Sequence, residues 1–144
     1  MLSARDLSVL DELPPVKIWG DDLDDASALK SFRGKFVVTS DGKFFAKLYP
    51  STEWDNIEFF HDMLVRELGV KDAESMDVKE VIVGGGKIEL EIMPEHAECR
   101  LYGKSTIYGD YDPLTIDSDA ISNEIQEVCD LGDKPIQVVA DYEA

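Results

Sequence analysis

Two strand-forming segments separated by a tight-turn signal constrain the fold of this chain more than any other feature. Residues 35–39 (KFVVT) and 43–49 (KFFAKLY) are rich in the aromatic and β-branched side chains that favour strands. Between them lies Ser40-Asp41-Gly42, whose residue types tolerate the backbone angles of turns. The pattern predicts a β-hairpin over residues 35–49, the clearest strand pair in the chain.

An amphipathic helix is predicted directly after this hairpin, over residues 52–68. Ser51 or Thr52 can cap its start, and Gly69 can end it. Apolar residues recur at helical spacing and form a single stripe that consists of Ile57, Phe60, Leu64 and Leu68. His61 lies at the margin of this stripe and is therefore expected to face inward.

Shorter patterns predict the remaining elements. Five further segments have the composition of strands: 13–19, 78–83, 88–92, 98–102 and 136–139. We interpret the three glycines at 84–86 as a turn between two of these strands. A second main helix carries Ile121, Ile125 and Val128 and ends near Gly132, whereas a short helix within residues 1–12 is permitted but not required. The fold class predicted is α+β, a single domain with a roughly six-stranded mixed sheet and two main helices.

Length and charge limit the class of protein further. With 144 residues, of which 44% are hydrophobic, the chain can form one domain, which we divide into an acidic N-terminal segment, 1–28, and a main domain, 29–144. The net charge of −17 opposes binding to nucleic acid. The first residues do not show the charged-then-apolar pattern of a secretion signal, and no apolar run approaches the roughly 20 residues that cross a bilayer. We therefore expect a soluble cytoplasmic protein without a membrane partner, and favour a monomer.

Common catalytic and cofactor motifs do not occur in the chain. The Gly-Lys pairs at 86–87 and 103–104 lack the glycine five residues earlier that a Walker A loop requires. Serine hydrolase and zinc peptidase motifs are missing as well. Cys99 and Cys129 lie outside any CxxC pattern, which favours buried thiols over a zinc site or a disulfide. We expect no metal and no cofactor.

Two glycine-containing segments, taken together, carry a family resemblance. Residues 81–88 (VIVGGGKI) and 102–109 (YGKSTIYG) are similar to the Gly-Gly-Gly-Arg turn and the Tyr-Gly-x-Ser-x-x-Tyr-Gly loop of the family that contains protein phosphohistidine phosphatase and the insect janus and ocnus proteins. The similarity continues through residues 120–124 (AISNE) and the final strand, and weakly back to residues 13–18. The order of the two loops is more specific than either loop alone.

This resemblance implies a metal-independent protein phosphatase that removes phosphate from phosphohistidine. The family holds the anion with main-chain amides of the serine loop, here Ser105, Thr106 and Ile107, and with basic side chains of the first hairpin, here Lys35 and Lys47. Successive amides in a tight loop can bind an anion, and ammonium groups can neutralise a phosphoryl group in transfer. Lysine replaces the family's arginine at position 47, so that bidentate binding is lost.

The position of the family's catalytic histidine depends on how the helix is aligned. Counting back from Gly84 makes His61 the general base, whereas counting back from Gly69 places Trp54 or Asp55 there. We favour His61, because imidazole titrates near neutral pH. His61 could instead be a core-margin histidine with a hydrogen-bond partner. Likewise, the chain could be a non-catalytic relative that binds a phosphorylated or acidic protein partner through the same loop.

Overall fold

A computed structural model describes the chain over residues 8–20, 23, 30–50, 61–70, 73, 76–129, 131 and 134–140. Residues 52–60 of the predicted helix lie outside the described residues, as do residues 21, 22 and 24–28 of the acidic N-terminal segment and residues 1–7 of the optional N-terminal helix. Within the described part, the first element is a short 3-10 helix, η1 (Ser8–Leu10).

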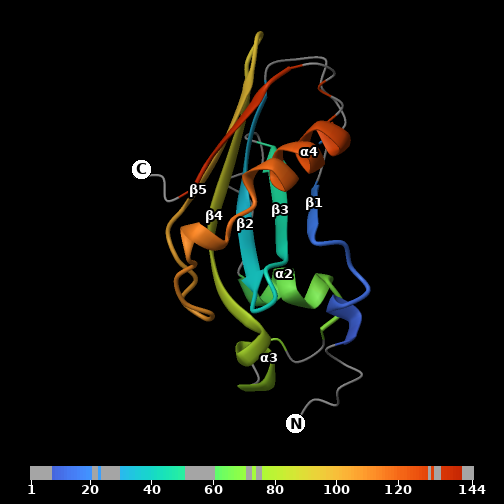
Figure 1. Cartoon of the computed structure of the whole chain (residues 1–144), viewed down its shortest axis with the longest axis vertical. Coiled ribbons are helices and arrows are strands. Elements are labelled where there is room, and N and C mark those ends of the chain that lie inside the picture. Colours follow the sequence, from blue (N-terminus) through green and yellow to red (C-terminus); the bar gives the residue numbers. More distant parts are fainter. Residues whose placement is uncertain are drawn as a thin grey trace.

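Six strands form one mixed sheet in the order β1-β3-β2-β4-β5-β6 (Figure 1). The strands are β1 (Val16–Gly20), β2 (Lys30–Thr39), β3 (Phe44–Pro50), β4 (Ile82–Ile92), β5 (Ala97–Tyr102) and β6 (Ile136–Val139). The two outer pairs, β1 with β3 and β5 with β6, are parallel, and the inner pairs are antiparallel. The predicted α+β sheet is therefore confirmed, including the hairpin, whose turn contains Gly42 at φ 88°.

Alternating side chains of the sheet build a hydrophobic cluster on each face. Phe36 of β2 packs in the cluster that also contains Ile121 and Ile125 of α4 (Ser118–Cys129), whereas Val37 packs with Leu64 and neighbouring residues of α2 (His61–Glu67). Figure 1 shows α4 along one face of the sheet and α2 crossing near one end of the strands. Because side chains alternate between faces, the α2 face receives every second residue of each strand.

The segment before the glycines differs from the prediction. Residues 78–81 belong to α3 (Met76–Val81) and not to a strand, whereas Ile82 and Val83 begin a continuous β4 that runs through all three glycines without a turn. These glycines are required by close packing: a Cβ at Gly84 would lie 2.4 Å from the carbonyl oxygen of Asp110, and one at Gly86 would lie 2.5 Å from that of Tyr102. The interpretation of residues 84–86 as a turn was therefore wrong.

The helices end largely as their sequences predict. Gly69, at φ 110°, follows the last turn of α2 and donates its N–H to the carbonyl of Arg66. The second main helix is confirmed as α4, and a 3-10 helix, η3 (Pro113–Thr115), precedes it. Cys99 and Cys129 are buried free thiols. No helix among the residues described is long and apolar enough to cross a membrane.

Candidate functional site

A row of lysines crosses the α2 face of the sheet. Lys35 of β2 lies directly opposite Lys47 of β3 on one side and opposite Lys87 of β4 on the other. Tyr102 of β5 extends the row, because it is paired with Lys87. Directly opposite residues in a sheet share a face and lie about 5 Å apart, so three like charges gather in one band. A band of this kind attracts anions despite the acidic composition of the whole chain.

The structure thus brings together Lys35 and Lys47, both expected from the sequence, and adds Lys87, which the sequence analysis did not select. A signal for Lys87 was present, because it directly follows the three glycines in the segment whose resemblance to a Gly-Gly-Gly-Arg turn was noted from the sequence. Its position on the same face as Lys35 follows only from the pairing of β2 with β4. Lys87 is exposed, and no carboxylate among the described residues forms an ion pair with it.

His61 faces inward from α2, as predicted, and is only 4% exposed. Its Nε2 lies 2.9 Å from the carbonyl oxygen of Gly86. Because a carbonyl oxygen can only accept, Nε2 carries the proton, and in the neutral ring Nδ1 is left with the lone pair. A Cβ at Gly85 would lie 3.0 Å from the Cδ2 of His61, so this glycine makes room for the ring.

The surroundings of His61 keep its ring neutral. The pKa of His61 is lowered to about 4, mainly by burial and also by the positive charges of Lys35 and Lys87, against the opposing effects of the Gly86 hydrogen bond and of Asp62. Burial and the nearby Lys87 also lower the pKa of Lys35. The imidazole is therefore uncharged at neutral pH and can act as a base, but burial and the two ammonium groups make it a weaker base than an ordinary histidine.

The loop at 103–109 lies against the same stretch of β4. The carbonyl oxygen of Gly109 accepts the N–H of Gly85 at 3.2 Å, and a Cβ at Gly103 would lie 3.8 Å from Cγ of Lys87. His61, Lys35 and this loop therefore all lie against the Gly85–Lys87 stretch of β4. Trp54 and Asp55, the alternative positions for the base, lie outside the described residues.

The amides of this loop are largely used within the loop itself. Ser105 is buried, and its Oγ accepts the N–H groups of Ile107 at 3.2 Å and Tyr108 at 3.0 Å. The N–H of Ser105 donates to the carbonyl of Gly109 at 3.1 Å. Thr106, at the tip, is exposed. A phosphate that used the Ile107 amide would have to replace Ser105 Oγ as its acceptor.

Lys47 is held by a carboxylate of α2. Its Nζ lies 2.7 Å and 2.9 Å from the two carboxylate oxygens of Glu67, and 5.2 Å from the ring centre of Tyr49. Burial lowers the pKa of Lys47, but Glu67 and Tyr49 together outweigh burial and leave that pKa raised. Lys47 therefore keeps its charge, and part of that charge is neutralised before any ligand arrives.

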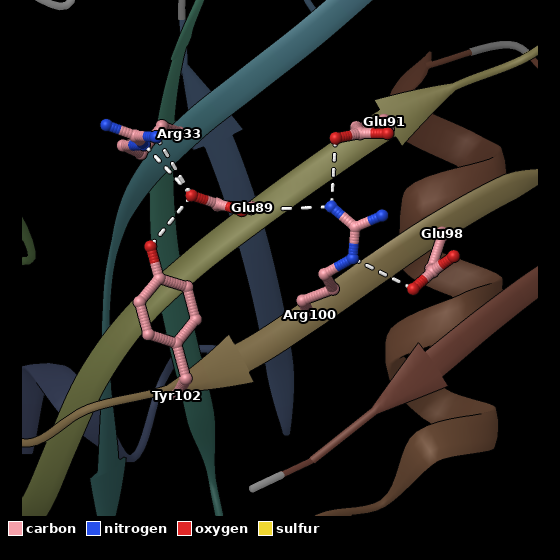
Figure 2. A network of polar contacts seen from close by, with 6 residues as sticks. All are labelled: Arg33, Glu89, Glu91, Glu98, Arg100 and Tyr102. Atoms are coloured by element: carbon pink, nitrogen blue, oxygen red, sulfur yellow. Dashed lines mark hydrogen bonds and ion pairs between the residues drawn. The ribbon is translucent and has the colours of Figure 1, made fainter. Parts of the chain in front are cut away.

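Beyond the lysine row, the same face carries an ionic network across β2, β4 and β5 (Figure 2). The guanidinium group of Arg100 lies between three carboxylates. Its nitrogens are 2.9 Å from a carboxylate oxygen of Glu91, 2.8 Å from one of Glu98 and 3.8 Å from one of Glu89. Glu89 also accepts hydrogen bonds from Arg33 at 3.1 Å and from the Tyr102 hydroxyl at 2.8 Å. Tyr102 donates to Glu89 of the network and is paired with Lys87 of the lysine row, so the network lies directly beside one end of the row.

Comparison with known protein families and with curated sequences found no match. No protein-family model matches the chain, and no curated protein sequence matches it at a significant level. Any assignment of function must therefore depend on the chemistry of the lysine row, of His61 and of the loop at 103–109.

Proposed function

We propose that the protein is a metal-independent phosphatase that hydrolyses phosphohistidine in proteins. The observation that carries the proposal is the placement of His61, a neutral imidazole tied through Nε2 to Gly86 beside Lys35 and Lys87. The substrate would be a phosphorylated protein or peptide, and the protein would act as a monomer in the cytoplasm. Similarity of residues 81–88 and 102–109 to two glycine-containing segments of the phosphohistidine phosphatase family supports the same function.

The reaction proposed uses His61 as a general base. Nδ1 of His61 takes a proton from a water molecule as the water oxygen attacks phosphorus. The bond between phosphorus and the substrate's histidine nitrogen breaks, and that nitrogen leaves with the bonding electrons and takes up a proton from solvent. His61 then returns the proton that it took from the attacking water to solvent. The ammonium groups of Lys35 and Lys87 offset the negative charge on the phosphoryl oxygens, which is the main task in phosphoryl transfer. Thr106 at the loop tip would contribute its amide.

A non-catalytic function is the second candidate, and the hydrogen bonds within the loop at 103–109 favour it. The amides of Ser105 and Ile107 already have acceptors inside the protein. Fewer N–H groups are therefore left to stabilise a phosphoryl group during its transfer. A protein of this kind would bind a phosphorylated or acidic partner through Lys35 and Lys87 without hydrolysing it.

Release of phosphate from a phosphohistidine peptide tests the proposal. Replacing His61 with alanine should lower the rate about 100- to 10,000-fold, because positioned general bases contribute that much. His96→Ala is the matched control, since His96 is exposed. The rate is normalised to folded protein by circular dichroism. Full activity in folded His61→Ala would remove His61 from the mechanism, and an inactive wild type that binds phosphate would favour the binding protein.

A further inference from the structure

The ion pair between Lys47 and Glu67 places a carboxylate on one of the three lysines of the row. Both oxygens of Glu67 lie within 2.9 Å of Lys47 Nζ, so the contact has the geometry of a close ion pair. The Lys47 side chain is only 15% exposed and that of Glu67 is 41% exposed. Lys47 therefore has little room to turn away, whereas Glu67 can move out into solvent.

Helix α2 reaches both ends of the lysine row. His61, the first described residue of the helix, contacts the carbonyl of Gly86 on β4, and Glu67, its last residue, contacts Lys47 on β3. Lys35 on β2 lies between these two strands. The same helix thus supplies the proposed base at one end of the row and a competing anion at the other end.

A phosphate that approached Lys35 and Lys87 would meet the carboxylate of Glu67 next to the third lysine. The phosphate must either displace Glu67 from Lys47 or bind with that negative charge nearby. Both routes weaken binding, because opposite charges attract and like charges repel over these distances. We infer that Glu67 limits the affinity of the site for a phosphoryl group by competing with it for Lys47, an inference that rests on the proposed function.

Titration with inorganic phosphate, followed by backbone amide chemical shifts, tests this inference. In Glu67→Gln, the dissociation constant of phosphate should fall about two- to fivefold, the range that a partly exposed ion pair provides. Combining Glu67→Gln with Lys47→Met should cancel the gain, because the released ammonium group is then missing. Thermal unfolding monitors whether each variant is folded.

Glu127→Gln is the matched control for net charge. Glu127 is exposed on α4, which packs on the opposite face of the sheet, so its replacement removes one negative charge far from the row. An equal gain in Glu127→Gln would overturn the inference in favour of a general charge effect, as would unchanged or weaker binding by folded Glu67→Gln. An inactive wild type whose phosphate affinity rises with Glu67→Gln would refute only the phosphatase. Absence of phosphate binding in both proteins would overturn the anion site and this inference together.

Discussion

His61 Nε2 donates a hydrogen bond to the carbonyl oxygen of Gly86 at 2.9 Å, and this contact joins α2 to the middle of β4. Gly86 lies opposite Phe36, in the part of the sheet where the three glycines allow close approach. The contact has two consequences for the imidazole: it selects the tautomer with a lone pair on Nδ1, and it holds the ring where burial disfavours its protonation.

The pH dependence of stability should report on this histidine. Because the pKa of His61 is lowered to about 4 in the folded protein, from 6.5 in a model peptide, the unfolded chain binds more protons between these values. The contribution of the neutral His61 ring to the free energy of unfolding is therefore complete above pH 6.5 and is lost as the pH falls toward 4. Its size should be about 3 kcal/mol. His61→Gln, which can still donate to Gly86, should lack this component.

Urea unfolding of both proteins between pH 4 and pH 8 measures this difference. The many carboxylates titrate in both proteins, so only the difference between the two curves belongs to His61. Parallel curves would mean that the ring is protonated as easily in the folded protein as in the unfolded chain.

Lys87 should affect anion binding without affecting stability. Its side chain is exposed, so Lys87→Met should change the free energy of unfolding by less than about 0.5 kcal/mol. Phosphate affinity should fall, and the pKa of Lys35 should rise toward its ordinary value, because the charge of Lys87 contributes to its lowering. Side-chain NMR titration of Lys35 and a phosphate titration check the two effects. Lys134→Met, on the segment before β6, is a control; an equal loss of phosphate affinity there would argue against a local role for Lys87.

Ser105 should be important for stability through its hydroxyl group. Replacement by alanine removes the acceptor for the amides of Ile107 and Tyr108, and Ser105 is only 2% exposed, so water cannot readily take its place. We expect a loss of about 1 to 3 kcal/mol in the free energy of unfolding. Thr106→Ala, at the exposed tip of the same loop, should cost less than about 0.5 kcal/mol. Chemical denaturation of both variants tests this, and equal costs would show that the hydroxyl of Ser105 is not the important group.

Arg100 should be the central residue of the ionic network. Arg100→Met leaves Glu89, Glu91 and Glu98 without their shared cation, and the pKa of Glu91, which the hydrogen bond from Arg100 lowers, should rise. The Arg100 side chain is 15% exposed and that of Arg33 is 48% exposed. We therefore expect a loss of about 1 to 3 kcal/mol for Arg100→Met and less than about 1 kcal/mol for Arg33→Met.

Added salt distinguishes two causes of the stability loss in Arg100→Met: repulsion among the remaining carboxylates and lost packing of the Arg100 side chain. Salt screens the repulsion among the three remaining carboxylates, so part of the stability of Arg100→Met should return at high ionic strength. If the loss were the same at every salt concentration, the cause would be lost packing of the Arg100 side chain.

Local patterns were enough to predict most of the elements of the fold. The hairpin at 35–49 and the helix with Ile121 and Ile125 were confirmed, because strand alternation and helical spacing involve neighbours in the chain. The failure of the strand prediction at residues 78–81 has a physical cause. A short apolar run does not distinguish a helix from a strand, and three glycines can mark either a turn or a close approach of backbones.

For the candidate site, residue types and loop motifs were sufficient to nominate Lys35, Lys47 and His61. They did not reveal that Lys87 joins the row or that Glu67 holds Lys47, because both facts depend on contacts between segments distant in sequence. The pairing of β2 with β3 and β4 decides which lysines share a face, since a shift of one residue would turn each side chain to the other side. The packing of α2 on that sheet brings His61 against Gly86, and burial at this contact, which no local pattern encodes, makes its imidazole neutral.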